Sequence, residues 1–531
     1  MSITIKRRRS KALPAMDQVS LGLEELSDFT EVVRDSDELR FRQGNANQLF
    51  VGDKPLKTYL QENGLSFVIQ LSAFLESYDF SGFVKAYSPI GRRAAHPRIM
   101  MGLIIYGMLN KQWSLRQLET LAVRDVGAWW ICGGLQPDHS TIGKFFNQHS
   151  KVLSEDFFVT LTQQLVRQLK LTTHDAAGDG TVIEAASSHY RILKADAARL
   201  EAEKAEEEAL LTPDNKDKQT KALISKEAAD IATNRQALLN KMGKPSAKVC
   251  VSSIEPTATV QPLKNKVNRP AYKPSILVDQ NRFIVGQYLH PTNENLAIRP
   301  MLGQHEQIHG QLPRCTMLDA SYHNIEVLQI FNAFELDILC PSGAVEKTGK
   351  WKKQSHQQLF GKSDFHYDDD LDAYICPEKK ELTPKQIRQD VNGRKYRYYV
   401  GKECSDCPIR SQCTKSARGR SIKRYDGEEL KEAMMQVLQH PRAKEKYRQR
   451  KALVEPVFAE LKERQALKRF HRRGLQKVKI EFVIHCVAYN LKRAIRLSDG
   501  VCLIYFMLYW RKNRGPWKIH SSYSMILLTK V

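Results

Sequence analysis

Apolar residues recur at spacings of three and four over residues 55–170, and this period predicts amphipathic helices. The segment HPRIMMGLIIYGMLNK predicts a buried helix that follows Pro97. Two more helices are predicted in SLRQLETLAVRD, with Ser114 as its N-cap, and in DHSTIGKFFNQH, with Asp138 or Ser140 as its N-cap. We therefore predict an all-helical domain over this range, and a helix-turn-helix-like DNA-docking unit is one use of such a domain.

Short β-compatible runs alternate with helical runs from about residue 174 onward. HDAAGDGTVIEAASS predicts a strand, SILVDQNRFIVGQYLH predicts a two-stranded hairpin, and CTMLDASY and LDILCPSG predict two further strands. LAIRPMLGQHEQIHG and NIEVLQIFNAFE predict helices between them. This alternation indicates an α/β core with helices packed on a sheet. The core is predicted to close with a helix that carries Glu455 and another over residues 476–496.

Two insertions interrupt the predicted core, which as a whole covers residues 171–496. Residues from about 190 to 245 are rich in Ala, Glu and Lys and are broken at LTPDN, which predicts a helical hairpin. Residues 345–440 are polar, rich in lysine and cysteine-bearing, with little periodicity. Residues 1–54 are predicted to form a loose N-terminal arm. The tail, residues 497–531, has no clear place in the predicted fold.

The charge of the chain indicates a protein that binds polyanions. The sequence contains 82 Lys and Arg against 59 Asp and Glu, a net charge of +23. Such an excess favours nucleic acid first and an anionic membrane surface second, and a ribosome-associated or merely basic protein is the remaining reading. The start MSITIKRRRS lacks the apolar stretch of a secretory signal, and GVCLIYFMLYW has about half the length of a membrane span. We therefore expect a cytoplasmic protein with no membrane partner.

Three acidic residues stand in positions where a metal site is expected. Asp179 in AGDGTVIEA and Asp319 in TMLDASYHN follow predicted strands, and Glu455 in VEPVFAELK lies in a basic segment. Taken singly, each has an ordinary interpretation as a turn cap or a helical counter-ion. In α/β sheets functional groups gather at the carboxyl ends of strands, so the three could converge as oxygen ligands for Mg²⁺. Two such ions would clamp the attacking and leaving oxygens of a phosphoryl displacement.

The segment around Glu455 also predicts where its helix begins. Pro456 is tolerated in the first turn of a helix, so we predict that the helix starts near the glutamate. Lys462 follows nearly two turns later and is predicted to share a face with Glu455, with its ammonium group placed for a DNA phosphate. Glu184, close to Asp179 in the sequence, is expected to be a neighbour of the site and not a ligand.

Several of these segments resemble a known family. DGTVIEAASS, LDASYHN and YRQRKALVEPVFAELK resemble the three signatures of bacterial insertion-sequence transposases of the DDE class. HPRIMMGLIIYGMLNKQWSLRQLE and DHSTIGKFFNQH resemble the N-terminal helical region of that family, so the resemblance covers roughly residues 90–495. It implies a ribonuclease-H-like core whose catalytic acids are Asp179, Asp319 and Glu455, with two Mg²⁺ or Mn²⁺ ions as cofactors.

The third signature of the family is a Tyr, an Arg, the Glu and a Lys at set intervals. Glu455 and Lys462 keep the family's spacing. The position that requires the arginine is Lys451, whereas Arg450 and Tyr447 stand in the neighbouring register. The resemblance implies that these basic and aromatic residues contact DNA. More basic residues follow the helix and are expected to contact DNA phosphates as well: Lys468, Arg469, Arg472 and Arg473.

The resemblance implies a transposase that cuts the ends of its mobile element and joins the 3′-hydroxyl to target DNA. Its partners would be the terminal inverted repeats, the target DNA and a second copy of the chain in a synaptic complex. Two alternatives stay open on the sequence: a catalytically decayed or domesticated relative that binds DNA without cutting it, and a ribonuclease-H-like nuclease without strand transfer.

Four cysteines fall within one short region of the second insertion: Cys376, Cys404, Cys407 and Cys413. The C-x₂-C pair is half of a common zinc site, because two thiolates on one tight turn can share a tetrahedral ion. The other spacings are looser than those of a strong zinc signature. A structural zinc ion and a set of free thiols are therefore both compatible with the sequence.

Overall fold

The computed structural model describes residues 40–42, 44–88, 92–188, 190–243, 249–263, 265–342, 359–390 and 393–513. Contacts between Cα atoms divide the chain into two compact units. Unit 1 consists of residues up to Thr172 and from Val483 onward, and unit 2 is Thr173–Phe482. Among the described residues, no helix combines the length and the apolar character that crossing a membrane requires.

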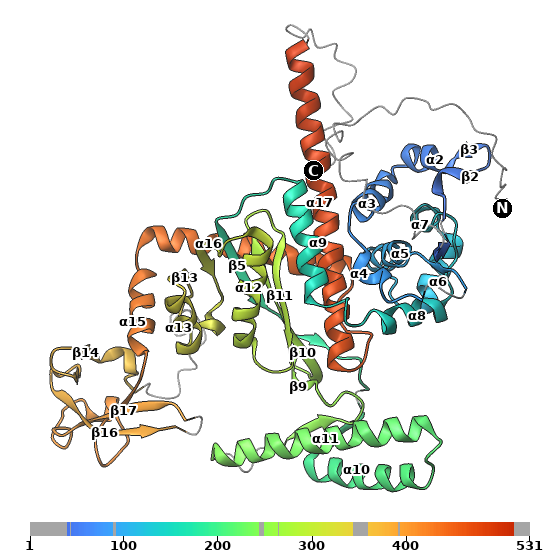
Figure 1. The fold of residues 1–531 in the computed structure, drawn as a ribbon. Helices are drawn as coiled ribbons and strands as arrows, with labels where there is room; N and C mark the ends of the chain where they lie inside the picture. Colours follow the sequence, from blue (N-terminus) through green and yellow to red (C-terminus); the bar gives the residue numbers. More distant parts are fainter. Residues whose placement is uncertain are drawn as a thin grey trace. The chain divides into compact units, whose positions relative to one another are not determined.

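Unit 1 is built almost entirely from helices (Figure 1). They are α2 (Leu56–Glu62), α3 (Ser66–Glu76), α4 (Ser81–Val84), α5 (Pro97–Leu109), α6 (Leu115–Arg124), α7 (Val126–Cys132), α8 (His139–Gln148), α9 (Glu155–Gln168) and the part of α17 (Leu475–Asn513) that begins at Val483. Helix α5 is buried over nearly its whole length, as its continuous apolar sequence predicted. From the sequence, residues 476–496 are predicted to belong to the core domain, whereas contacts between Cα atoms assign those from Val483 to unit 1.

The helix starts predicted at N-caps are confirmed. Ser114 and Gln117 form a capping box, in which Ser114 Oγ accepts from the Gln117 amide at 3.2 Å and Gln117 Oε1 accepts from the Ser114 amide at 3.1 Å. Of the two candidates for α8, Asp138 is the cap, and its carboxylate accepts from the Thr141 amide at 2.6 Å. Local hydrogen bonds of this kind can be inferred from sequence because both partners lie within one turn.

The described part of the predicted N-terminal arm is folded. Strands β1 (Phe41–Arg42) and β4 (Ala94–Ala95) pair in parallel, and η2 (Ala46–Gln48), β2 (Phe50–Val51) and β3 (Lys54–Pro55) follow β1. Phe41 is 1% exposed and makes edge-to-face contacts with Tyr87 and His96. The aromatic contacts, which the polar composition of the segment did not indicate, hold this stretch against the helices. Residues 1–39 lie outside the described residues.

Unit 2 is organised around a mixed sheet with strand order β11-β10-β5-β12-β13. These strands are β5 (Asp175–Gly180), β10 (Asn268–Asp279), β11 (Ile284–His290), β12 (Cys315–Met317) and β13 (Asp337–Leu339), and the short strands β6 (Ile183–Glu184) and β9 (Thr259–Pro262) also pair with β10. Strand β10 is antiparallel to β11 and β5, whereas β12 is parallel to both β5 and β13. The predicted alternation of strands and helices is confirmed, and the unit is a mixed α/β structure.

Helices connect and cover these strands. Helix α12 (Ile298–His309), preceded by η3 (Glu294–Ala297), packs against β10 and β11, and α16 (Pro441–Ala459) packs against β5 and β10. Helix α13 (Ile325–Ala333) connects β12 to β13 and packs against β13 and α15 (Glu428–Val437). Burial of Ile276, Leu277 and Val278 on β10 explains the unbroken apolar run of its sequence, because a central strand is covered on both faces.

The first insertion is the predicted helical hairpin. Helices α10 (Ala195–Leu210) and α11 (Lys216–Lys241) pack through small residues, including Ala198, Ala228 and Ala232. Strands β7 (Ile192–Lys194) and β8 (Cys250–Ser252) pair with each other at its base. The small side chains allow the two helices to approach closely, which is why alanine recurs along both.

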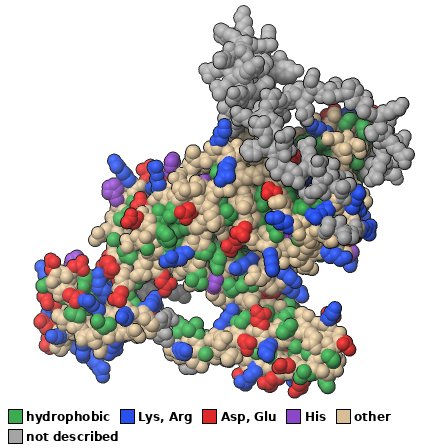
Figure 2. Space-filling model, viewed as in Figure 1, with side chains coloured by type: hydrophobic (Ala, Val, Ile, Leu, Met, Phe, Trp, Pro, Cys, Tyr) green, Lys and Arg blue, Asp and Glu red, His purple; other side chains and the backbone are tan. Residues whose placement is uncertain are grey.

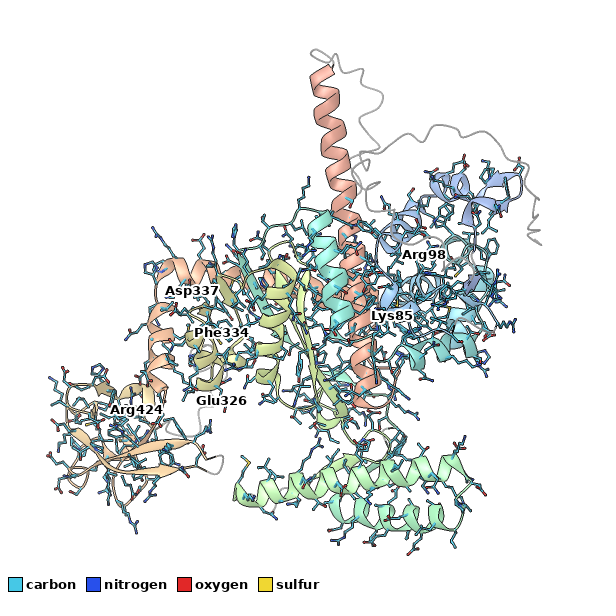
Figure 3. The ribbon with its side chains drawn as sticks, viewed as in Figure 1. Lys85, Arg98, Glu326, Phe334, Asp337 and Arg424 are labelled. Atoms are coloured by element: carbon cyan, nitrogen blue, oxygen red, sulfur yellow. The ribbon has the colours of Figure 1, made fainter. Side chains whose placement is uncertain are left out.

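The second insertion contains a five-stranded antiparallel sheet that the sequence pattern did not predict. Its strands are β14 (His366–Asp368), β15 (Ala373–Ile375), β16 (Glu381–Gln389), β17 (Lys395–Gly401) and β18 (Ser421–Tyr425), in that order across the sheet. Charged side chains of both signs are interspersed over its surface (Figure 2). The guanidinium of Arg424 lies 3.6 Å from the Tyr367 ring centroid and pairs with Glu432 at 2.6 Å (Figure 3 labels Arg424). Polar and aromatic residues of this kind fill a small core, so the usual apolar alternation is absent.

Helix α16 corrects one prediction. It starts at Pro441, where His440 accepts from the Arg442 amide, and not near Glu455. Pro456 lies inside the helix, in its last turn before the π-helical segment η7 (Glu460–Arg464). A proline removes one amide donor wherever it stands in a helix, so it did not locate the first turn.

Candidate active site

Asp179 and Asp319 stand level with each other on neighbouring strands. Strands β5 and β12 run parallel, with Cys315 paired to Asp175 and Met317 paired to Ala177. Continuing this register by two residues places Asp319 opposite Asp179, just beyond the last paired residue of β12. Both carboxylates therefore emerge at the carboxyl ends of adjacent parallel strands, where functional groups gather in such sheets.

One guanidinium group bridges the two aspartates. Arg450 of α16 places Nη1 3.1 Å from Asp179 Oδ2 and Nη2 3.6 Å from Asp319 Oδ1. The Arg450 side chain is 8% exposed, against 25% for Asp179 and 44% for Asp319. Asp179 Oδ1 also accepts from the Gly180 amide at 2.8 Å. The guanidinium group of Arg450 thus lies between the two carboxylates and pairs with both.

Burial and charge act together on the groups of this cluster. Burial raises the pKa of Asp179 and the neighbouring Asp319 carboxylate adds to this, although Arg450 opposes both. Burial by itself lowers the pKa of Arg450, but Asp179, Tyr447 and Asp319 outweigh it, so the pKa is raised and the guanidinium stays charged. Tyr447 lies against Arg450, 6.0 Å from its ring centroid to Cζ, and burial raises the pKa of Tyr447 to about 12.

Helix α16 follows strand β5 through a series of contacts. Lys446 pairs with Asp175 at 3.0 Å, one turn before Arg450 reaches Asp179. Beyond the end of α16, Lys462 donates to Thr181 Oγ1. From the sequence, Arg450, Tyr447 and Lys462 are predicted to contact DNA. In the structure Arg450 pairs with two partly exposed carboxylates, because α16 turns this side chain toward the sheet.

Glu455 and Lys451 lie on the exposed side of α16. Val454 and Val457, by contrast, are fully buried and hold the helix to unit 2. Glu455 is five residues from Arg450, about 140° around the helix, so its side chain points away from the face that meets Asp179 and Asp319. Across the described ranges of the chain, no group of three or more His, Cys, Asp or Glu side chains is already arranged to hold a metal ion.

Polar groups that the sequence did not single out gather around Gly180. A Cβ built on this glycine would lie 2.8 Å from Glu294 Oε2, 3.2 Å from Ser275 Oγ and 3.4 Å from the Tyr322 hydroxyl. Tyr322 is fully buried and donates to Ser275 at 3.3 Å. Glycine at this position therefore leaves room for a carboxylate next to the strand end that carries Asp179. The only sequence signal was the pair of glycines that flank the aspartate.

The basic residues after the helix are distributed between surface and structure. Lys468 is exposed and pairs with Glu463 at 2.8 Å. Arg469 donates to the carbonyl of Ser187 at 2.6 Å, and Arg473 donates to the carbonyl of Ala186 at 3.1 Å. These arginines therefore fasten their own loop to the segment that follows β6.

The four cysteines of the second insertion lie near enough for their charges to interact, although no three of them are already arranged around a metal position. Burial raises the pKa of Cys413, the nearby Arg420 lowers it, and the thiols of Cys404, Cys407 and Cys376 each raise it. Backbone amides of Lys380 and Arg420 point at two of the sulfurs, at 3.3 and 3.5 Å. All four are free cysteines. The fold of the five-stranded sheet thus brings together residues that are up to 37 positions apart (376 to 413).

Comparison with protein-family models gives two matches. A model described as "Transposase DDE domain" matches residues 375–495, and one described as "Transposase domain (DUF772)" matches residues 58–148. The first match includes Glu455 and the four cysteines, and it does not extend to Asp179 or Asp319. In a comparison with curated proteins, none matches the chain.

The DDE match indicates an enzyme that acts on DNA. Together with the second match, it indicates an insertion-sequence transposase of the DDE class, a DNA transposase. The family resemblance seen in the sequence is thereby confirmed over residues 58–148 and 375–495.

Proposed function

We propose that this transposase cuts the phosphodiester bonds at the ends of its mobile element and joins the freed 3′-hydroxyl to target DNA. The catalytic core would be a ribonuclease-H-like fold. Its support is the mixed sheet, in which β10 runs antiparallel to β11 and to the central strand β5, whereas β12 and β13 run parallel to β5. Two copies of the chain would hold two element ends in one synaptic complex.

The observation that carries this proposal is the bridge between Asp179, Arg450 and Asp319. The guanidinium group of Arg450 reaches Asp179 Oδ2 at 3.1 Å and Asp319 Oδ1 at 3.6 Å. The oxygens of both carboxylates therefore point toward the same small region. Carboxylate oxygens are the ligands that Mg²⁺ and Mn²⁺ prefer, and the donors at this site therefore fit a divalent ion. When bound, a pair of such ions would activate the attacking oxygen and stabilise the leaving oxygen of the displacement.

Glu455 would complete the acidic set from α16. Its helix is fixed to β5 by the pairs Lys446–Asp175 and Arg450–Asp179 on one side, and Lys462 is fixed to Thr181 on the other. These contacts hold α16 and the segment after it against β5, and the proposal requires the exposed side chain of Glu455 to turn toward the two aspartates when metal binds. Arg450 would then orient the two aspartates, and Lys451 and Lys462 would lie beside the DNA backbone.

The test compares two aspartates on the same strand. Element-end DNA is incubated with Mg²⁺ and either the parent, Asp179→Asn or Asp175→Asn. Asp175 is the matched control, because it pairs with Lys446 and not with Arg450. We expect cleavage by the parent and by Asp175→Asn, and a loss of at least a hundredfold for Asp179→Asn at unchanged DNA affinity. Equal cleavage by Asp179→Asn and the parent would remove this aspartate from the catalytic site.

The same reaction separates the remaining alternatives. A supercoiled target plasmid in the tube reports strand transfer as a change in plasmid form. Cleavage without joining would make the protein a nuclease, and DNA binding without cleavage by the parent would make it a decayed relative. The presence of Asp179, Asp319 and Glu455 supports the active enzyme.

We also propose that the four cysteines hold a structural zinc ion within the second insertion. Their proximity and the two amides directed at sulfur support it, because thiolate ligands of zinc accept such hydrogen bonds. The ion would tie the β15–β16 connection to the segment after β17, and it would take no part in the reaction on DNA.

A further inference from the structure

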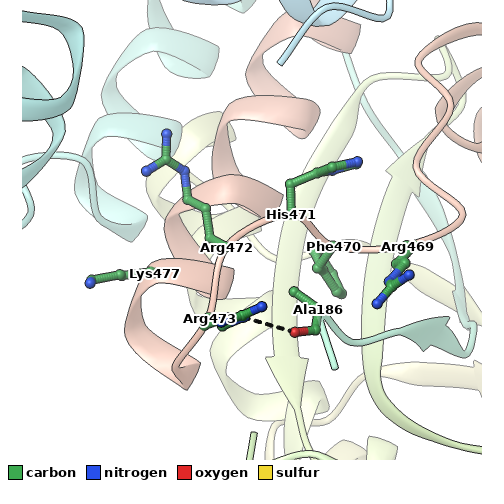
Figure 4. A pocket seen from close by; sticks show the side chains of 7 residues that line it. All are labelled: Ala186, Arg469, Phe470, His471, Arg472, Arg473 and Lys477. Atoms are coloured by element: carbon green, nitrogen blue, oxygen red, sulfur yellow. Dashed lines mark hydrogen bonds between the residues drawn. The ribbon is translucent and has the colours of Figure 1, made fainter. Parts of the chain in front are cut away.

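A cavity of about 560 Å³ lies at the loop between η7 and α17 (Figure 4). We call this loop, residues 469–474, the basic loop. The residues that line the cavity are Ala186, Arg469, Phe470, His471, Arg472, Arg473 and Lys477. Four of them carry a positive charge, and none carries a negative charge. An opening of this kind suits an anion.

Two buried glutamates fix the backbone of the basic loop by accepting hydrogen bonds from its amides. Glu481 is 1% exposed and accepts from the backbone amides of His471, at 3.0 Å, and Arg472, at 2.9 Å. Its carboxylate also contacts His471 Nδ1 at 3.2 Å. A buried carboxylate is costly unless it is fully hydrogen-bonded, so these contacts fix both the glutamate and the loop.

The second glutamate fixes the other end of the loop. Glu255, also 1% exposed, accepts from the Gly474 amide at 2.9 and 3.0 Å and from the Tyr272 hydroxyl. Thr257 donates to the same carboxylate at 3.4 Å. Gly474 has a φ of +84°, a turn conformation that glycine adopts without strain, immediately before α17 begins. The loop is therefore anchored to buried charge at its centre and at its C-terminal end.

The arginines are held in place before any ligand arrives. Arg469 Nη2 donates to the Ser187 carbonyl at 2.6 Å and Nε donates to the Ala185 carbonyl at 3.2 Å. Arg473 Nε donates to Ala186, toward which it turns in Figure 4. Each guanidinium has five N–H donors in a planar fork, so these bonds orient the group without using it up.

We propose that this cavity binds one backbone phosphate of the element-end DNA, and that Glu255 and Glu481 are positioning residues that build it. The proposal rests on the proposed DNA transposase function and adds a location. Ala186 follows Asp179 by seven residues, which span at most about 25 Å even when fully extended. Along B-DNA that distance corresponds to about seven base pairs. The phosphate therefore lies within about seven base pairs of the bond held at Asp179.

The first experiment measures DNA binding against salt concentration, in a chelator, so that cleavage plays no part. Arg473→Ala and Glu481→Gln should each make the slope of log affinity against log salt less negative by about 0.9, the value for one lost phosphate contact. Lys204→Ala removes an exposed lysine of α10 and is the matched control, with an unchanged slope. An unchanged slope for Arg473→Ala overturns the phosphate site.

The second experiment is ethylation interference, which identifies the phosphate. Ethylation of one phosphate within about seven base pairs of the element end should weaken binding by the parent. The same modification should have no effect on Arg473→Ala or Glu481→Gln, while interference at other phosphates persists. Uniform weakening at every position would assign Glu481 a structural role only. If Glu481→Gln does not fold, as judged by circular dichroism, Glu255→Gln tests the positioning role and Arg473→Ala still tests the cavity.

The two proposals fail separately. If the parent protein does not cleave DNA but still shows ethylation interference near the element end, only the catalytic proposal is contradicted. Normal cleavage with no interference near the element end would contradict the phosphate site alone.

Discussion

Arg450 and Asp179 form an ion pair whose arginine is almost fully buried, with 3.1 Å between Nη1 and Oδ2. The same guanidinium reaches Asp319 at 3.6 Å. In the absence of a divalent ion, Arg450 is the counter-charge that keeps two neighbouring carboxylates together. This relationship leads to a prediction on metal binding.

Arg450→Ala should destabilise the metal-free protein and increase the stabilisation that metal provides. Breaking a fully buried pair typically costs about 3–5 kcal/mol, and the loss here should be smaller, because water reaches the two carboxylates that are left without a partner. Mg²⁺ or Mn²⁺ should restore part of the loss by neutralising the same carboxylates. Lys446→Ala is the control, since its pair with Asp175 is more exposed and should contribute less than about 1 kcal/mol. Thermal unfolding with and without metal measures both, and equal effects of the two substitutions would contradict the prediction.

Purified protein should contain about one zinc ion per chain if the cysteine cluster holds one. Cys407→Ser should lower the zinc content and the stability of the five-stranded sheet, because three thiolates hold the ion less tightly than four. Cys250→Ser is the matched control, since Cys250 lies on β8 at the base of the helical hairpin. Elemental analysis measures the zinc content. A zinc-free parent protein, prepared without chelator, would leave free thiols as the interpretation.

Two buried histidines of α12 predict a loss of stability in mild acid. Burial lowers the pKa of His305 and of His309 to about 4, below the ordinary value of 6.5. As the pH falls from about 6.5 to about 4, the unfolded chain binds protons that the folded chain excludes. The free energy of unfolding should therefore fall by on the order of 1.4 kcal/mol per pH unit for each histidine.

The double variant His305→Gln/His309→Gln should flatten this pH dependence in denaturant unfolding. His366→Gln, which changes an exposed histidine of β14, serves as the control. A slope that is the same in the parent and in the double variant would assign the acid sensitivity to other groups.

Two helical glycines should respond in opposite directions to alanine. A Cβ on Gly303 of α12 meets no atom within 4 Å, so Gly303→Ala should stabilise the protein by about 0.5–1 kcal/mol through helix propensity. A Cβ on Gly107 of α5 would lie 2.5 Å from the Gln112 carbonyl oxygen and would also clash with Leu118. Overpacking of this kind typically costs about 1–3 kcal/mol. Denaturant unfolding compares the two variants, and a shift in the same direction for both would contradict the geometry.

Features whose partners lie close together in the sequence were predictable, whereas features that depend on distant residues were not. The capping box of Ser114, the hairpin after Ser275 and the helical insertion were all predictable, because their partners lie close together in the sequence. The strand-end positions of Asp179 and Asp319 also followed from local pattern. Their shared register did not, because it depends on the pairing of strands about 140 residues apart (319 against 179).

The pairing of Arg450 with the two aspartates could not be predicted from the sequence for a related reason. In the sequence it is one of several basic residues, and only the packing of α16 on β5 turns it toward the aspartates. Glu481 had a visible signal, a single acid in the apolar run KVKIEFVIHCV, and such a residue is expected to be fully hydrogen-bonded when buried. The five-stranded sheet of the second insertion had almost no such signal, because its small core mixes a few apolar residues, such as Leu382 and Ile422, with tyrosines and the buried Arg424.

The pairing of β7 with β8 has a consequence for how the enzyme can be altered. Ile192 is paired with Ser252, so the chain leaves and re-enters at points one strand spacing apart, about 4.8 Å. The α10–α11 hairpin is therefore a long loop whose two ends are held together by the β7–β8 pair. The entropic cost of closing such a loop depends only weakly on its length. A short turn between Lys194 and Cys250, or a foreign domain with adjacent termini, can replace it without moving the strand that carries Asp179. We therefore expect the hairpin to be an exchangeable module, because its replacement would leave the pairing of β5 with β10 and β12 in place.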